Sequence, residues 1–280
     1  MLKRIITAVV ALAIFVPVLI YSYTWVFPAV LAVLAMVAVY EICDCFGYGT
    51  KAYLYIPLFA LAAVVPFVLH YWNYSLINAT LYALPLIIVF ELAVAMLSRG
   101  KIKYTDNAGI CLFAFYAIYG LAALVLLREV PHGNYIYLLA FIGAWATDTG
   151  AYFAGVLFGK HKLIPEVSPK KTVEGSIGGI VGCCIGFAVW GLIVQAISAC
   201  TVYWLLLMAY AALAGVVSQI GDLVASYVKR EKGIKDYGFI FPGHGGVMDR
   251  FDSVIAVSIV LSSVMYLTEA FPIELIPPVV

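Results

Sequence analysis

Long apolar segments, separated by short polar ones, make up most of this chain of 280 residues. Each apolar segment has about 20 residues, the length that an α-helix needs to cross the hydrocarbon core of a bilayer. The pattern predicts nine such helices, at residues 5–22, 25–43, 53–72, 77–97, 108–127, 134–157, 176–198, 202–228 and 253–271. The predicted fold class is therefore an all-α polytopic membrane protein with about nine transmembrane helices.

Composition agrees with this pattern, because 65% of the residues are hydrophobic and only 11% are charged. Nine spans leave no room for a sizeable soluble domain. The net charge of +1 argues against nucleic acid as a partner. The six cysteines form no CxxC pair, so the sequence suggests neither a zinc site nor a disulfide framework.

The basic residues indicate how the helices are oriented. If the N-terminus is cytoplasmic, nine spans place every Lys and Arg except Arg128 on the cytoplasmic side. Cytoplasmic loops of membrane proteins carry such an excess of Lys and Arg. The C-terminal tail carries only acids and falls outside. We therefore expect a cytoplasmic N-terminus and an external C-terminus. The short N-terminus, without a long polar extension, suggests the inner (plasma) membrane of a bacterial cell.

Charge divides the chain into two predicted parts. Residues 1–130, about five spans, form an N-terminal region with little charge, in which Glu41 is expected at a helix end in the membrane interface. Residues 131–280, about four spans, form a C-terminal catalytic region. Its two charged cytoplasmic loops are 158–175 and 229–252.

The densest charge lies in residues 221–253, GDLVASYVKREKGIKDYGFIFPGHGGVMDRFDS. Charge within so apolar a chain is costly, which makes this cluster the default functional site. On a helix, the spacing of Asp222, Ser226 and Lys229 puts them on one face. Pro and Gly at 242–246 then break the helix and allow the backbone to approach a ligand. Asp249 and Asp252 either cap the next helix or hold a hard cation.

A second polar stretch runs from residue 145 to residue 179. Asp148 lies inside a predicted span, where a carboxylate costs a few kcal/mol unless it has a partner or faces water. Lys170 and Lys171 precede Thr172, a predicted helix cap, and would suit a phosphate. They could also be ordinary anchors on the cytoplasmic side.

Together the two stretches offer what phosphate binding beside a metal requires. Lys and Arg neutralise phosphate oxygens, and aspartates hold Mg²⁺ that bridges those oxygens. The cluster is expected at the cytoplasmic face and at membrane depth, within reach of both a nucleotide and a lipid head group. The residues therefore predict phosphoryl or nucleotidyl transfer at the cytoplasmic interface, without naming the base or the lipid.

One motif is more specific. It reads Ser226-x-Val228-Lys229-Arg230-x₄-Lys235-Asp236-x-Gly238-x₂-Phe241-Pro242-x-His244-Gly245-Gly246-Val247-x-Asp249-Arg250-Phe251-Asp252. This motif resembles the signature of the phosphatidate cytidylyltransferase (CDP-diacylglycerol synthase) family. Gly221-Asp222 and the stretch around Asp148 and Ser168–Gly175 are also similar to that family, whereas the first 130 residues resemble it only as a run of spans.

The resemblance implies an Mg²⁺-dependent enzyme of phospholipid biosynthesis. It would convert CTP and phosphatidic acid into CDP-diacylglycerol and pyrophosphate. The lipid bilayer is a further partner, and a second, monovalent cation and a homodimer are possible additions. The attacking lipid phosphate is already anionic, so catalysis would consist of positioning and charge neutralisation.

The resemblance also implies roles for single residues. Asp222 and Asp249 would hold Mg²⁺, and substitution of either by Asn should abolish activity in a folded protein. The catalytic set is Asp222, Ser226, Lys229, Arg230, Lys235 and Asp249. The substrate-binding set is Asp148, Lys170, Lys171, Asp236, His244, Gly245, Gly246, Arg250 and Asp252. Taken singly, most of these residues could be helix caps, anchors or surface pairs.

Other membrane functions fit less well. CDP-alcohol phosphotransferases and prenyltransferases also use aspartates with metal, but their motifs, such as DGxxAR or DDxxD, do not occur here. A transporter would need polar residues along a path and preferably repeated halves. The predicted spans of the first half hold only Glu41 and Glu91 as charged residues, and no internal repeat is visible.

Overall fold

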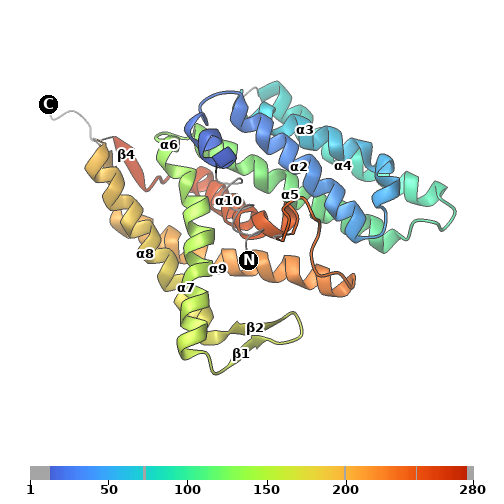
Figure 1. Cartoon of the computed structure of the whole chain (residues 1–280). Helices are drawn as coiled ribbons and strands as arrows, with labels where there is room; N and C mark the ends of the chain where they lie inside the picture. Colours follow the sequence, from blue (N-terminus) through green and yellow to red (C-terminus); the bar gives the residue numbers. More distant parts are fainter. Residues whose placement is uncertain (1–12, 72–73, 199, 244, 276–280) are drawn as a thin grey trace. The chain divides into compact units, whose positions relative to one another are not determined.

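The computed structural model describes residues 13–71, 74–198, 200–243 and 245–275, and these are mostly helical (Figure 1). The helices are α2 (Val26–Cys45), η1 (Gly49–Tyr55), α3 (Ile56–His70), α4 (Tyr74–Leu97), α5 (Tyr104–Glu129), α6 (Gly133–Ile136), α7 (Leu138–Phe158), α8 (Val173–Ile197), α9 (Trp204–Glu231) and α10 (Met248–Thr268). The strands are β1 (Lys162–Ile164), β2 (Ser168–Thr172), β3 (Cys200–Val202) and β4 (Ile273–Leu275).

The predicted all-α membrane class is confirmed. Every predicted span is helical over most of its described residues, including residues 13–20 of the first. Within the described ranges, six helical segments are long and apolar enough to cross a membrane, and they contain α2, α3, α5, α8, α9 and α10. In α4 the apolar part is Tyr82–Leu97, which is shorter than a membrane-spanning helix. The number nine and the orientation therefore stay predictions.

Contacts between Cα atoms divide the chain into two compact units, each of which combines two stretches of sequence. The first unit contains Met1–Val125 and Lys229–Phe251, and the second contains Leu126–Val228 and Asp252–Val280. Helices α9 and α10 each contribute to both units. The charged stretch 229–251 thus packs with the N-terminal helices, although it is far from them in the sequence.

In the first unit, α2 lies against α3, and its buried side is lined by small and branched apolar side chains. The end of α9 is tied to α5 by Lys232, whose Nζ lies 2.7 Å from Asp106 Oδ1 and 4.2 Å from the centre of the Phe46 ring. Asp106 falls just outside the predicted span 108–127, but it lies in the first turn of α5. An acidic residue there complements the positive end of the helix dipole.

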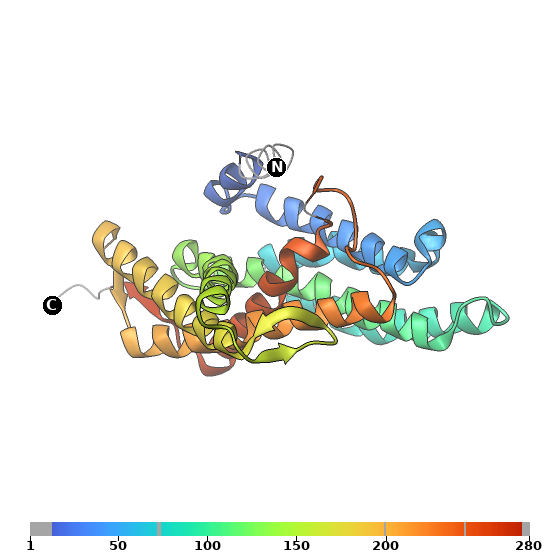
Figure 2. The same cartoon turned by 60° about the horizontal axis from the view of Figure 1, so that its bottom comes forward.

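In the second unit, α7 and α8 pack very closely because glycines face each other. A Cβ atom added at Gly182 would lie 2.7 Å from the Ala146 carbonyl oxygen and 3.0 Å from Gly150 Cα. Figures 1 and 2 show these two helices side by side, with the hairpin of β1 and β2 joining them. Such stripes of small residues let helix backbones approach in membranes.

The β1–β2 hairpin was not predicted, although the cap that follows it was. Thr172 is the last residue of β2 and pairs with Lys162 of β1. Its side-chain oxygen accepts a hydrogen bond of 3.1 Å from Gly175 N, which confirms Thr172 as the N-cap of α8. The hairpin therefore holds the segment with Lys170 and Lys171 directly before the start of a helix.

Candidate active site

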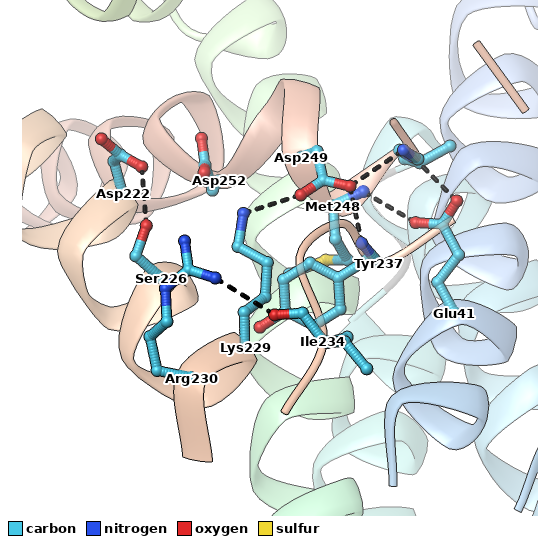
Figure 3. A network of polar contacts seen from close by, with 12 residues as sticks. Glu41, Asp222, Ser226, Lys229, Arg230, Ile234, Tyr237, Met248, Asp249 and Asp252 are labelled. Carbon is cyan, nitrogen blue, oxygen red and sulfur yellow. Dashed lines mark hydrogen bonds and ion pairs between the residues drawn. The ribbon is translucent and has the colours of Figure 1, made fainter. Parts of the chain in front are cut away.

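The side chain of Asp249 is the centre of the polar network in the first unit (Figure 3). Asp249 lies in the first turn of α10 and its side chain is only 3% exposed. Its Oδ1 is 2.7 Å from Lys229 Nζ, and its Oδ2 accepts hydrogen bonds from Tyr237 N (2.7 Å) and Gly246 N (2.9 Å). One carboxylate thus joins the end of α9, the middle of the following loop and the start of α10.

Lys229 is the cation of this network. Its side chain is 11% exposed, and its Nζ lies 5.4 Å from the centre of the Tyr237 ring. The Tyr237 ring is itself stacked on Phe113 of α5, with 6.1 Å between ring centroids. A buried ammonium group needs such compensation, which here comes from a carboxylate and the face of an aromatic ring.

Position 245 requires glycine for two reasons. Its φ is +87°, a left-handed conformation that residues with a side chain rarely adopt. In addition, a Cβ atom at this position would lie 2.6 Å from Asp249 Oδ2. The loop can therefore fold over the Asp249 carboxylate only because residue 245 has no side chain.

Glu41 belongs to the same network and was missed as a site residue. It lies near the end of α2, as expected, but it is buried, with only 2% of its surface exposed. Its Oε1 and Oε2 each accept a hydrogen bond of 2.9 Å, from Val247 N and Met248 N respectively. A carboxylate inside an apolar helix is the signal that could have identified it.

Four other predicted residues of the first unit are open to solvent. The side chains of Arg230, Lys235, Asp236 and Arg250 are exposed. Arg230 Nη1 donates a hydrogen bond of 3.2 Å to the Ile234 carbonyl oxygen, which closes the turn after α9. These groups are accessible to a ligand in water. The predicted residue His244 lies outside the described residues.

In the second unit, Asp222 of α9 has two polar neighbours. Its Oδ2 is 2.5 Å from Lys171 Nζ, and its Oδ1 accepts a hydrogen bond of 3.3 Å from Ser226 Oγ. The side chains of Lys171 and Asp222 are 27% and 30% exposed. The structure therefore brings together three residues from the two charged stretches that the sequence analysis singled out.

Close packing of α8, α9 and α10 supports the group formed by Lys171, Asp222 and Ser226. Gln219 Nε2 donates a hydrogen bond of 3.1 Å to the Ser176 carbonyl oxygen of α8, and Ser253 Oγ of α10 donates one of 3.1 Å to Ser218 O. A Cβ atom at Gly221 would lie 2.8 Å from the Asp252 carbonyl oxygen. Asp222 thus follows a glycine at which two helix backbones nearly touch.

The remaining predicted residues lie in the second unit. Asp148 is an exposed residue of α7, and Lys170 is an exposed residue of β2. Asp252 is buried in the first turns of α10, and its Oδ1 accepts a hydrogen bond of 2.7 Å from Ser253 N. None of these contacts assigns the three residues to a substrate, and their binding roles stay predictions.

The positions of the carboxylates indicate which of them could bind Mg²⁺. Within the described parts of the chain, no group of three or more His, Cys, Asp or Glu could hold a metal ion. Asp222 nevertheless fits a magnesium ligand, because its carboxylate is partly exposed and already attracts a cation, the Lys171 ammonium group. Asp249 fits less well as it stands, since both of its oxygens already accept donors.

Comparison with known proteins agrees with the motif in the sequence. The family model described as "Cytidylyltransferase family" matches residues 2–268. Proteins named phosphatidate cytidylyltransferase are similar to the chain over 91% of its length and 95% of their own. Those of Staphylococcus saprophyticus, Staphylococcus haemolyticus and Staphylococcus aureus are 36%, 35% and 32% identical to it, respectively.

These matches cover both units, and so include the N-terminal helices, which the motif alone did not reach. An identity above 30% over nine-tenths of both chains is sufficient to establish common membership. The chain belongs to the cytidylyltransferase family, among the phosphatidate cytidylyltransferases.

Proposed function

We propose that this protein transfers the cytidylyl group of CTP to phosphatidic acid. An oxygen of the lipid phosphate attacks the α-phosphorus of CTP, the bond from that phosphorus to the bridging oxygen of the β-phosphate breaks, and pyrophosphate leaves. The product is CDP-diacylglycerol, a precursor in phospholipid biosynthesis. No strong general base is required, because the attacking phosphate oxygen is already anionic.

The observation that carries this proposal is the similarity to named phosphatidate cytidylyltransferases over 91% of the chain. The geometry of the charged groups supports it. Both reactants are polyanions, and each unit offers an ammonium group that is oriented by an aspartate, Lys229 in the first unit and Lys171 in the second. Paired in this way, the two lysines have fixed positions before a substrate arrives, which is the preorganisation that phosphate transfer needs.

The chain's own residues would mainly bind and orient. Lys229, Arg230 and Lys235 would neutralise the triphosphate or the lipid phosphate, and Ser226 would donate a hydrogen bond to a phosphate oxygen. Arg230 and Lys235 are exposed and can change partners at little cost, whereas Lys229 is nearly buried. We therefore assign first contact with the nucleotide to the exposed pair and charge neutralisation at the reacting phosphate to Lys229.

Asp222 and Asp249 stay the predicted ligands of magnesium, and Asp222 is the more accessible of the two because its carboxylate is partly exposed. When bound, Mg²⁺ neutralises phosphate oxygens and orients them. A second, monovalent cation and a homodimer remain predictions from the family resemblance. The distribution of Lys and Arg supports a reaction at the cytoplasmic face of the membrane, and the bacterial relatives support a bacterial cell membrane as its location.

Product formation by the purified protein in liposomes tests the proposal. CTP tritiated on its base is supplied with phosphatidic acid and Mg²⁺, with and without EDTA, and tritium is counted in the lipid phase. We expect metal-dependent label in a product with the mass of CDP-diacylglycerol. Lys51→Ala should match the wild type, because Lys51 is exposed in η1 and outside both charged stretches. No lipid label from folded wild-type protein would refute the proposal.

A further inference from the structure

Three consecutive backbone amides at the start of α10 are bound by two carboxylates of the first unit. Gly246 N donates to Asp249 Oδ2, Val247 N to Glu41 Oε1 and Met248 N to Glu41 Oε2, all at 2.9 Å. The first amides of a helix have no partner within that helix. Here two of the three amides bind the side chain of Glu41, which comes from a helix some two hundred residues earlier in the sequence (Figure 3).

The glycine-rich loop is shaped around the Glu41 carboxylate. A Cβ atom at Gly238 or at Gly246 would collide with the Glu41 carboxylate. The amide of Gly246 and the space beside it are occupied by carboxylates, so glycine is required here whatever the predicted role of Gly246 in binding a substrate. Two glycines of the family motif thus accommodate one glutamate outside that motif.

The contacts of Glu41 lead directly to the charged pair of the site. Fixing the amides of residues 247 and 248 sets the position of Asp249, the next residue along the chain. Asp249 in turn orients Lys229 at 2.7 Å. A change at Glu41 therefore moves the Lys229 ammonium group without touching it.

We propose that Glu41 is a positioning residue for cytidylyl transfer, which holds Asp249 and Lys229 in the reactive arrangement through the start of α10. This inference rests on the proposed function. Substitution by Gln keeps the size of the side chain but replaces one acceptor oxygen by an NH₂ group, which would face a backbone N–H. Substitution by Asp keeps both acceptors and shortens the side chain by one methylene group.

Steady-state kinetics of Glu41→Gln and Glu41→Asp provide the test, with Asp44→Asn as the matched control. Asp44 lies three residues later on α2, but it is exposed. For Glu41→Gln we expect kcat to fall by at least about tenfold while KM for CTP changes little, because small displacements at a reacting centre have effects of this size. Glu41→Asp should recover part of the loss, and Asp44→Asn should behave as wild type. Wild-type kcat in Glu41→Gln would overturn the inference.

A double-mutant cycle separates this inference from the proposed function. Gly246→Ala should lower the melting temperature strongly in the wild type and less in Glu41→Ala, where the carboxylate that meets the new Cβ atom is gone. Additive effects would show that the contact is not formed and would overturn the inference without any activity measurement. If the cycle shows coupling but the wild type forms no lipid product, the proposed function is what fails.

Discussion

At the scale of single residues, the two aspartates predicted to hold metal differ in what else they do. Asp222 is partly exposed and has two side-chain neighbours. Asp249 is nearly buried and binds one ammonium group and two backbone amides. The same substitution should therefore have different consequences at the two positions.

We expect Asp222→Asn to abolish turnover and to leave the melting temperature almost unchanged, because an exposed ion pair contributes at most about 1 kcal/mol. Asp249→Asn should abolish turnover and also destabilise the protein, since breaking a buried pair costs about 3–5 kcal/mol. The expectation from sequence was that both variants stay folded, and the structure adds that Asp249→Asn should be the less stable of the two. Thermal unfolding in detergent, measured beside activity, checks the difference; equal melting temperatures would contradict it.

At the scale of elements, the contact of α7 with α8 depends on glycines that face backbone atoms. A Cβ atom at Gly182 would lie 2.7 Å from the Ala146 carbonyl oxygen, whereas one at Gly143 would have its nearest neighbours at 3.4 Å. The first separation is a clash with a group that cannot rotate away. The second is an ordinary van der Waals contact.

We therefore expect Gly182→Ala to destabilise the protein by about 1–3 kcal/mol, the usual cost of overpacking. Gly143→Ala is the matched control, and should be neutral or slightly stabilising because alanine favours helix by about 0.5–1 kcal/mol over glycine. The measurement is thermal unfolding of both variants in the same detergent. A greater loss in Gly143→Ala than in Gly182→Ala would show that the two helices do not pack in this way.

Much of the element structure could be predicted from sequence, because hydrophobic length reports directly on membrane helices. The β1–β2 hairpin could not, since its strands of three and five residues carry no clear alternation. The start of α10 was placed at residue 253 instead of Met248, because the helix begins in the polar stretch that was interpreted as a loop. Its first turn depends on a cap from Glu41, which helix propensity does not report.

The candidate site, too, could be predicted from sequence only in part. The motif drew attention to residues 226–252, whose chemistry stays a prediction, and the spacing of Asp222 and Ser226 correctly predicted that they meet on one helix face. The partner of Glu41 was not predictable, because 206 residues separate it from Val247 and nothing in the sequence says which helix start a buried carboxylate caps. Likewise, the pairing of Lys171 with Asp222 depends on the packing of α8 against α9.

At the scale of the whole molecule, the distribution of Lys and Arg makes a prediction about topology. With nine spans, the N-terminus is cytoplasmic and the C-terminus external. Alkaline phosphatase fused to the C-terminus should therefore be active, and green fluorescent protein fused there should not fluoresce. The opposite pair of results would require either an even number of spans or an external N-terminus, and would contradict this topology.

The most direct test of the central claim follows the phosphorus atoms of CTP. Cytidylyl transfer carries the α-phosphorus into the lipid and releases the other two as pyrophosphate, whereas a kinase would carry the γ-phosphorus into the lipid. The purified protein is given phosphatidic acid, Mg²⁺ and CTP labelled at either position, and label is counted in the lipid phase. We predict label from the α-position alone. Label from the γ-position, or from neither, would contradict the assignment of this protein as a source of CDP-diacylglycerol.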